Sequence, residues 1–334
     1  MQILALPTNS TSCRVCEFHL TDSGLSPHLN ITGTGGKTMM KPVTLDDREL
    51  ITRVLQAYQP DISELTFTNL FIWQEHYNFV WDFFGDWLVI GGRAPDGKRW
   101  ALPPVGPPGR GKVVREVLEW LREEGGSPHS AIERADRRLI EELSRDESFV
   151  VEPMREHFDY LYRTEDLIAL SGRKYHGKKN HLNAFQHSYH AHFEVLGNEH
   201  LARSLALADA WCRFKRCKDD LGLQGEWKAV KKCLTHYQEL SLMGGVLIVD
   251  GEVQAFSVGE PLTKDTVVVH FEKANPAIRG IYVAINQQCC ERLWAAFPFV
   301  NREQDLDNEG LRRAKLSYHP VSLVEKFRVT LALY

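Results

Sequence analysis

The sequence of 334 residues contains no long hydrophobic run, since its longest apolar stretches, residues 69–73 and 244–249, have only the length of strands. A membrane-spanning helix needs about 18 or more consecutive apolar residues, so no such helix is predicted. The amino terminus also lacks the basic segment that opens an export signal. Together these absences predict a cytoplasmic protein that does not cross a membrane.

Cysteine is scarce and irregularly spaced. The seven cysteines are an odd number without the spacing of a disulfide framework, which predicts reduced thiols. Neither sign of charge is in excess, because 40 Lys and Arg residues stand against 44 Asp and Glu residues. The net charge of −4 argues against a protein that coats nucleic acid or is held on an anionic membrane by its overall charge, and we expect no DNA partner. Local basic patches are compatible with this balance.

The first 38 residues are rich in Thr, Ser and Gly and lack apolar periodicity, which predicts a disordered leader. An alternative start of translation lies directly after it, at Met39 or Met40. The Gly-Lys-Thr of residues 36–38 ends like a phosphate-binding P-loop, but Ile31 stands where that motif requires glycine. We therefore predict no nucleotide site in this segment.

Two sets of residues could contribute to a metal site, but each lacks the remaining ligands. Cys13 and Cys16 form half of a zinc site without the other half. Strand alternation would place His190 and His192 on one face near His187, but no cysteine or paired carboxylate completes a set there. We therefore predict no metal site.

The composition is that of an ordinary globular protein, with 43% hydrophobic and 25% charged residues. The chain is longer than the size at which one hydrophobic core usually stops growing, which favours two domains. Apolar periodicity predicts helices at residues 45–57, 112–123, 135–143, 199–215, 226–240, 281–295 and 310–316. It predicts strands at residues 67–73, 79–84, 87–91, 99–102, 131–134, 149–162, 192–196, 246–249, 253–258, 266–272, 299–301 and 324–333.

The same order of elements occurs twice, about 145 residues apart, which indicates a structural duplication. The predicted fold class is α/β (α+β), with two tandem domains that are each a mixed sheet flanked by helices. We expect a leader at residues 1–38, a first domain at 39–164, a basic connector at 165–190 and a second domain at 191–334. The alternative is a single irregular α+β domain.

Each half contains a strand, a loop and a helix amino terminus in succession, at residues 109–112 and 272–282. Such junctions bind anions, because the first-turn N–H groups and the helix dipole face the ligand. Acetyl-coenzyme-A-dependent N-acyltransferases use this architecture with a loop of the form Gln/Arg-x-x-Gly-x-Gly/Ala. Gly106 stands where Gln or Arg belongs in the first loop, and the second loop keeps a single glycine. No cofactor is therefore predicted with certainty, and acetyl-CoA or another acyl-CoA is the alternative.

The densest polar segment, residues 301–320, follows a predicted strand and contains a predicted helix, a position where ligands bind at the rim of such sheets. Glu303 and Asp305 are candidates to hold an ammonium group or accept its proton, and Arg302 and Lys315 to hold a carboxylate or phosphate. The alternative is a solvated loop and an amphipathic helix with charge pairs.

The connector is the second polar concentration, and an aromatic residue and histidines are interleaved with its charges. Four basic residues fall within seven positions: Arg173, Lys174, Lys178 and Lys179. Such a patch suits phosphates, whereas the alternative is a solvated linker between domains.

Three motifs carry a resemblance to a known family. They are the Ser-Gly-Arg-Lys-Tyr-His-Gly-Lys-Lys-Asn-His of residues 171–181, the Asn-Pro-x-Ile-Arg-Gly of residues 275–280, and Asn-Arg-Glu-x-Asp at 301–305 with its continuation at 310–320. The sequence resembles the family containing the C-terminal domain of phosphatidylglycerol lysyltransferases and its soluble, stand-alone relatives of unknown function, from about Met39 to the C-terminus.

The resemblance implies two tandem GNAT-like (acyl-CoA N-acyltransferase) domains and an aminoacyltransferase. Members with an assigned activity move an aminoacyl group from aminoacyl-tRNA to a lipid head group, and the related Fem-type enzymes move it to peptidoglycan precursors. The membrane-bound lysyltransferases carry a transmembrane region that is absent from this sequence, so the acceptor need not be a lipid. The expected acceptor is a lipid head group or another amine or hydroxyl. A coenzyme-A-dependent N-acyltransferase acting on a small amine and a non-catalytic binding module are the alternatives.

The same hypothesis assigns roles to individual residues. The expected catalytic residues are Glu303, Asp305, Lys315 and Tyr318. The expected substrate-binding residues are Arg173, Lys174, Tyr175, His176, Lys178, Lys179, Asn180, Asn275, Arg279, Gly280, Asn301, Arg302 and Arg312.

Overall fold

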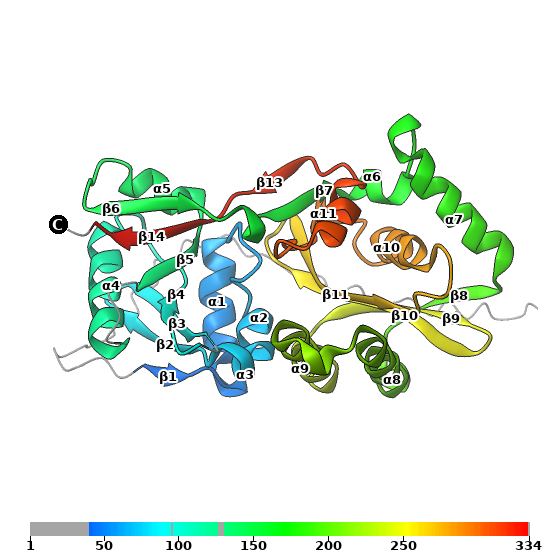
Figure 1. The fold of residues 1–334 in the computed structure, drawn as a ribbon, viewed down its shortest axis with the longest axis horizontal. Helices are drawn as coiled ribbons and strands as arrows, with labels where there is room; N and C mark the ends of the chain where they lie inside the picture. Colours follow the sequence, from blue (N-terminus) through cyan, green and yellow to red (C-terminus); the bar gives the residue numbers. More distant parts are fainter. Residues whose placement is uncertain (1–39, 95, 126–129, 333–334) are drawn as a thin grey trace, which may run out of the picture. The chain divides into compact units, whose positions relative to one another are not determined.

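The computed structural model describes residues 40–94, 96–125 and 130–332. The predicted leader, the pair Cys13 and Cys16 and the Gly-Lys-Thr of residues 36–38 lie outside these ranges. The described chain folds into two seven-stranded mixed sheets with helices packed on them (Figure 1), which confirms the predicted fold class. Within these ranges, no helix is long and apolar enough to span a membrane.

The first sheet has the strand order β1-β2-β3-β4-β5-β14-β6. Its strands are β1 (Lys41–Pro42), β2 (Val80–Phe84), β3 (Trp87–Arg93), β4 (Arg99–Ala101), β5 (Ala131–Ala135), β6 (Phe149–Pro153) and β14 (Phe327–Leu331). Its helices are α1 (Arg48–Tyr58), α2 (Phe67–Ile72), α3 (Gln74–Tyr77), α4 (Gly111–Gly125) and α5 (Arg137–Leu143). Strand alternation decides the packing, since Leu88 and Ile90 of β3 join the core under α1 and α2, whereas Val89 joins the core under α4.

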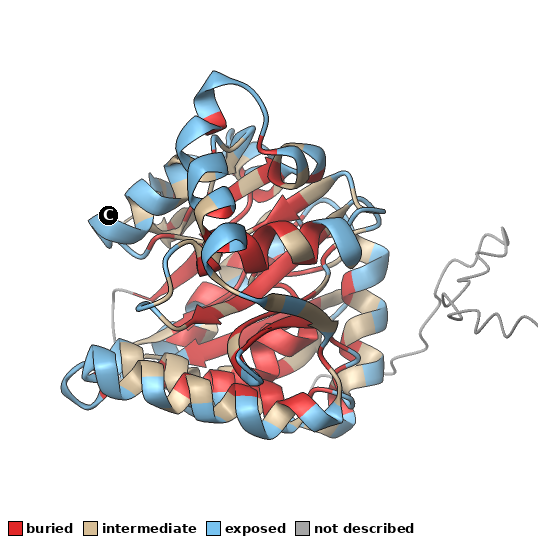
Figure 2. Cartoon of the chain, turned by 90° about the vertical axis from the view of Figure 1, so that its right-hand side faces the viewer, coloured by how far each residue is buried: buried red, intermediate tan, exposed pale blue. Residues whose placement is uncertain are grey.

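The second sheet has the strand order β13-β7-β12-β11-β10-β9-β8. Its strands are β7 (Asp159–Arg163), β8 (Ala191–Val195), β9 (Met243–Val249), β10 (Glu252–Pro261), β11 (Thr266–Ala274), β12 (Phe299–Asn301) and β13 (Ser322–Val324). Its helices are α6 (Thr164–Ala169), α7 (His176–Ser188), α8 (Asn198–Lys215), α9 (Leu221–Thr235), α10 (Ile281–Arg292) and α11 (Glu309–Leu316). One face of this sheet packs on α8 and α9, and the other on α6, α7 and α10. Figure 2 shows buried residues in the sheets and exposed residues on the outer sides of the helices.

The strand predicted at residues 67–73 was wrong. Residues 67–73, predicted as a strand, form helix α2, whose amino terminus is capped by the Thr66 side chain accepting from the N–H of Asn69 at 3.0 Å. All six residues of α2 are buried, so the helix lacks the one-sided apolar pattern by which a surface helix is identified. The segment 165–190, expected to be a basic connector, contains α6 and α7, which pack against α10.

The cysteines also differ from expectation. Cys212 and Cys217, at the end of α8, are joined as a disulfide, whereas reduced thiols were predicted. Cys233, Cys289 and Cys290 are free and buried. The five-residue separation of the bonded pair is too local to be recognised as a framework.

The two sheets exchange strands. Strand β7 follows β6 in the chain but pairs in the second sheet, and β14 follows β13 but returns to the first sheet between β5 and β6. The predicted domain boundaries stay a prediction, but each sheet depends on a strand from the other half of the chain.

A buried ion pair lies where the chain crosses between the sheets. The ammonium group of Lys326, which is fully buried, lies 2.6 Å from Oδ1 of Asp159 and 2.6 Å from Oε2 of Glu64. Asp159 also accepts hydrogen bonds from the backbone N–H of Ser63 at 2.9 Å and from the Asn301 side chain at 3.0 Å. Burial raises the pKa of Asp159, and the charge of Lys326 opposes that rise. One carboxylate thus connects four segments of the chain.

Removing the cation from this network should destabilise the fold. Lys326→Met leaves Asp159 and Glu64 without their cation, so we expect the free energy of unfolding in urea to fall by about 3–5 kcal/mol. Adding Asp159→Asn should recover part of that loss, because the uncompensated charge is then removed. A loss below about 1 kcal/mol for the single variant would show that the pair does not hold the crossing.

Candidate active site

The second sheet opens between its two parallel strands. Strands β11 and β12 pair only from Thr266 to Val268, although β11 continues to Ala274. A β-bulge lies where the strands part, since Val258 and Gly259 of β10 are opposite Phe271 and Val269, which leaves His270 as the extra residue. Bulges bend a strand and re-aim its side chains, and they are frequent beside active sites.

The chain that leaves β12 passes along this opening. Asn301 is buried and fixes its start, because its amide donates to Asp159 and its Oδ1 accepts from the N–H of Glu303 at 2.8 Å. Glu303, Leu306 and Asp307 all adopt left-handed backbone conformations, with φ between 50° and 59°. Such conformations are strained for residues other than glycine and are frequent at functional sites.

Glu303 connects the opening to both halves of the molecule. Its Oε1 accepts a hydrogen bond from Asn69 of α2 at 3.2 Å and lies 3.2 Å from Nδ1 of His270. Both contacts fall on Oε1, so within the described residues Oε2 has no partner. Nε2 of His270 lies 2.9 Å from Oε1 of Glu260. Burial alone would lower the pKa of His270, but its hydrogen bonds to Glu260 and Glu303 outweigh that effect and raise the pKa to about 9.

Arg302, next to Glu303, forms the centre of a second cluster. Its Nη2 donates to Oε1 of Glu272 on β11 at 3.0 Å, and its guanidinium lies 4.7 Å from the ring centre of Tyr318. Its Nη1 is buried and forms no hydrogen bond within the described residues. The ammonium group of Lys178 on α7 lies 4.0 Å above the same Tyr318 ring.

Two lysines in this cluster have lowered pKa values. Burial, reinforced by the charge of Arg302, lowers the pKa of Lys178 and that of Lys315 to about 8 each. Lys315 donates to the backbone carbonyls of Arg302 and Glu303, so it fixes the turn between them. The cluster therefore contains three cationic side chains, those of Arg302, Lys178 and Lys315, and one carboxylate, that of Glu272. Its net charge is positive.

Asp305 is fully occupied by the protein. Its carboxylate accepts two hydrogen bonds from Arg312 at 3.0 Å each, one from the Tyr160 hydroxyl at 2.7 Å and one from Arg155 at 3.1 Å. Burial would raise its pKa, but these donors lower it to about 2. The geometry therefore makes Asp305 and Arg312 the anchor of the loop.

The other predicted residues lie around the opening at varying distances. Tyr175 is buried and its hydroxyl donates to the carbonyl of Tyr318 at 3.0 Å. Lys174 pairs with Asp166 at 3.7 Å. The exposed residues are Arg173, His176, Lys179, Asn180 and Arg279. Asn275 bonds Gln254 and lines a separate cavity of about 560 Å³ beside α8.

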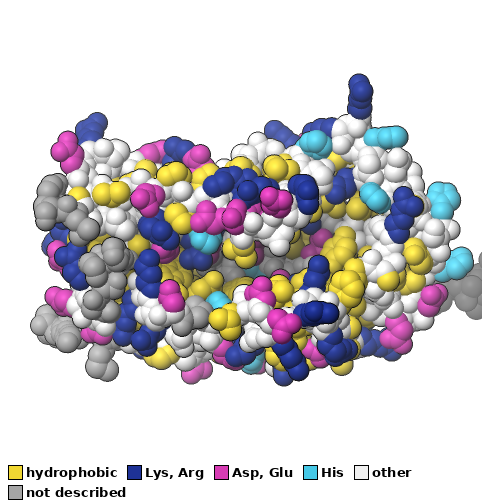
Figure 3. All heavy atoms as spheres, in the orientation of Figure 1, with side chains coloured by type: hydrophobic (Ala, Val, Ile, Leu, Met, Phe, Trp, Pro, Cys, Tyr) yellow, Lys and Arg dark blue, Asp and Glu magenta, His cyan; other side chains and the backbone are white. Residues whose placement is uncertain are grey.

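Helix α7 brings the predicted segments together. Gly280 has a φ of 84°, and a Cβ there would lie 2.2 Å from the carbonyl oxygen of His181 on α7. Lys178, one turn earlier on α7, contacts Tyr318. Figure 3 shows charged side chains gathered over the loop after β12 and α11, beside a hollow edged with hydrophobic side chains.

The strand-loop-helix junction of the first half, at residues 109–112, is blocked by a side chain of the protein itself. Glu142 of α5 accepts hydrogen bonds from the backbone N–H groups of Gly109 and Arg110 at 2.9 and 2.8 Å, where α4 begins. It also pairs with the buried Arg110 guanidinium at 2.7 Å. The protein's own carboxylate thus occupies the position where an anion was expected.

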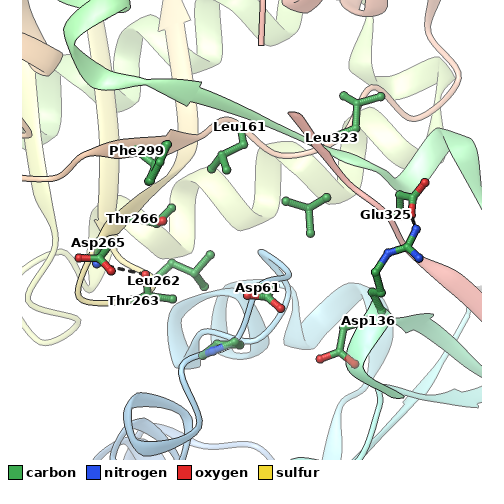
Figure 4. Close-up of a pocket in the computed structure, with 13 residues that line it drawn as sticks. Asp61, Asp136, Leu161, Leu262, Thr263, Asp265, Thr266, Phe299, Leu323 and Glu325 are labelled. Atoms are coloured by element: carbon green, nitrogen blue, oxygen red, sulfur yellow. Dashed lines mark hydrogen bonds and ion pairs between the residues drawn. The ribbon is translucent and has the colours of Figure 1, made fainter. Parts of the chain in front are cut away.

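A crevice of about 420 Å³ elsewhere contains none of the predicted site residues (Figure 4). Its wall includes Asp61, Asp136, Leu161 and Asp265, and an ion pair between Arg137 and Glu325 closes one side. Within the described ranges, no group of three or more His, Cys, Asp or Glu side chains is arranged to hold a metal.

No site role was predicted for His270 or Asn69, and Glu272 was named only as the first residue of the junction at 272–282. His270 lies in a predicted strand with valines and a phenylalanine, from Val267 to Phe271. A lone histidine inside such an apolar run was the available signal. Asn69 had none, because it lies in the helix that was predicted as a strand.

Two mixed sheets, each with a parallel strand pair that leads through a loop into a helix, define a tandem GNAT-like fold. Residues 55–330 match the family described as phosphatidylglycerol lysyltransferase, C-terminal, and the chain belongs to this family.

Solved structures and one curated relative are similar to the chain. A conserved protein of unknown function from Bacteroides thetaiotaomicron is 31% identical, with a TM-score of 0.82 over 89% of this chain and 100% of that one. L-PGS from Bacillus licheniformis is 15% identical, with a TM-score of 0.60 over 88% of this chain and 94% of that one. An uncharacterized protein of Mycoplasmoides gallisepticum is 22% identical over 171 residues, which are 51% of this chain. The matched region spans 55% of that relative's length.

The ion pairs of His270 predict a pH-dependent stability. Because folding raises the pKa of His270 from 6.5 to about 9, its stabilisation is fully present below about pH 6.5 and is lost as the pH rises through about 9. We expect the loss of unfolding free energy in His270→Gln to be larger at about pH 6 than above about pH 9, by up to about 3 kcal/mol.

Urea denaturation at both pH values measures this difference. The exposed His187 of α7 provides the control, since His187→Gln should show no comparable pH dependence. An equal loss for His270→Gln at both pH values would contradict a charged His270.

Proposed function

We propose that this protein transfers an aminoacyl group from aminoacyl-tRNA to an amine or hydroxyl acceptor, at the opening between β11 and β12. The observation that carries the proposal is the buried Nη1 of Arg302, which has no hydrogen-bond partner among the described residues. Buried polar atoms are normally hydrogen-bonded, so this nitrogen favours a ligand that offers it an acceptor oxygen. Membership of the phosphatidylglycerol lysyltransferase family supports the same reaction class.

The chemistry requires little beyond positioning and charge. An aminoacyl ester is already activated, so the acceptor N–H or O–H attacks its carbonyl carbon, the bond to the ribose oxygen of the tRNA breaks, and the acceptor's proton passes to that oxygen. Glu303 relays this proton or binds the ammonium group of the amino acid. Arg302 and Lys178 stabilise the negative charge that develops on the carbonyl oxygen.

The remaining predicted residues act as positioning or docking groups. Asp305 and Arg312 anchor the loop, Asn301 and Lys315 hold the backbone of Glu303, and Tyr318 forms the platform beneath Lys178. The exposed basic residues before and along α7 contact phosphates of the donor: Arg173, Lys174 and Lys179.

Neutralising Glu303 tests its role. Glu303→Gln keeps the size of the side chain but removes its charge, so we expect transfer of labelled amino acids from total aminoacyl-tRNA to a lipid or metabolite fraction to slow about a hundredfold or more. The exposed Glu309 of α11 provides the matched control, since Glu309→Gln should retain full activity. Thermal melting of each variant separates loss of activity from loss of folding.

Two outcomes would contradict the proposal. Equal rates for Glu303→Gln and wild type would remove Glu303 from the reaction. Stabilisation by acetyl-CoA without any transfer from aminoacyl-tRNA would favour the coenzyme-A-dependent alternative, because a ligand that binds the folded state raises its melting temperature.

The lowered pKa of Lys178 predicts a pH-dependent affinity for the donor. As the pH rises through about 8, Lys178 loses its proton, so wild-type affinity for tRNA should fall. Lys178→Arg keeps its charge and should have a flatter profile, whereas Lys178→Gln should bind weakly throughout. Filter binding from about pH 7 to 9 measures all three, and identical profiles would exclude Lys178 from donor binding.

A further inference from the structure

The hairpin of α8 and α9 ends in an exposed tip. Helix α8 ends at Lys215, a short turn at Cys217–Asp219 follows, and α9 begins at Leu221. The two helices lie side by side on one face of the second sheet (Figure 1). Neither the candidate active site nor the proposed reaction uses any residue of this tip.

Two large apolar side chains on the tip face solvent. Phe214 is 66% exposed and Leu221 is 68% exposed, and these are the highest values for large hydrophobic residues in the described chain. They flank the turn on both sides. The preceding turn of α8 continues the apolar surface, because Leu207, Ala210 and Trp211 line the cavity of about 560 Å³ together with Phe214. Exposed apolar surface that is continuous with an apolar cavity marks an interaction site more often than a single exposed residue does.

Cations surround the exposed pair. Arg213, Lys215, Arg216 and Lys218 lie within the same turn of chain, and all four are exposed. The structure gives none of them an ion pair with a described residue. Two acidic residues face them from the tip: Asp219, and Asp220, which caps α9 by accepting from the N–H of Leu223 at 3.0 Å. Figure 3 shows dark-blue side chains gathered over α8 and α9.

We propose that this tip docks on an anionic lipid surface, with Phe214 and Leu221 entering the headgroup region and the four cations contacting lipid phosphates. Stable attachment to a membrane needs two signals, and here an apolar insertion and a polybasic patch occur in one turn. The net charge of the whole chain does not oppose this, because attraction to the surface acts within about one Debye length of roughly 8–10 Å. A nucleic acid would use the cations and could stack a base on Phe214, but it would leave the aliphatic Leu221 exposed, whereas a lipid surface covers both apolar side chains.

The inference is independent of the proposed transfer reaction, because the binding measurement needs no donor. Flotation of the full-length protein with vesicles of phosphatidylcholine, with and without about one quarter of phosphatidylserine, measures docking directly. We expect binding only to the anionic vesicles. The variant Phe214→Ser/Leu221→Ser should weaken it about tenfold or more, and so should Lys215→Glu/Lys218→Glu.

Matched variants on distant surfaces provide the controls. Val195, which is 62% exposed on β8, tests whether any exposed apolar residue matters, and Val195→Ser should bind like wild type. The exposed Lys112 of α4 serves the same purpose for charge in Lys112→Glu. Thermal melting confirms that each variant is folded.

Three results would overturn the proposal. The first is absence of binding to anionic vesicles. The second is equal weakening by Val195→Ser and by the tip variants. The third is tight binding of tRNA that depends on Lys215 and Lys218, with no vesicle binding, which would make the tip a nucleic-acid surface.

Discussion

The buried contact between Lys326 and Asp159 is the constraint on which the rest of the structure depends. It lies where the chain crosses from the first sheet to the second and where it returns. A buried charge is costly unless its partner is in place, so this contact penalises any arrangement in which the two strands exchange differently. Its effect reaches the candidate site, because Asp159 also holds Asn301, and Asn301 holds the backbone of Glu303.

Strand separation explains why charges gather at the candidate site. Where β11 and β12 part, their backbones no longer bond to each other, and side-chain pairs bridge the opening instead: His270 with Glu303, and Glu272 with Arg302. Each pair places a cation on one strand opposite a carboxylate on the other. Because each of these charges has its partner, the site tolerates burial, and among the described residues Nη1 of Arg302 is still without a hydrogen bond.

Local patterns in the sequence predicted best those elements that have one buried side and one exposed side. Helix α4 was found because its buried and exposed positions alternate at the helical period. Helix α2 was mistaken because all of it is buried, and the bulge at His270 shifts the pairing of β11 without any local signal. The partners of Asp305 could not be predicted for a different reason. Arg155 and Tyr160 lie about 150 residues away in the sequence, and only the fold brings them close to Asp305.

The two halves differ in a way that assigns them separate tasks. In the first half, Glu142 and Arg110 fill the amino terminus of α4, so the duplicated junction there has become part of the core. In the second half, the corresponding strands open onto a positively charged cluster. The first half still contributes to that opening, because Asn69 of α2 donates to Glu303. Neither sheet alone would orient Glu303, so the closed half supports the open one.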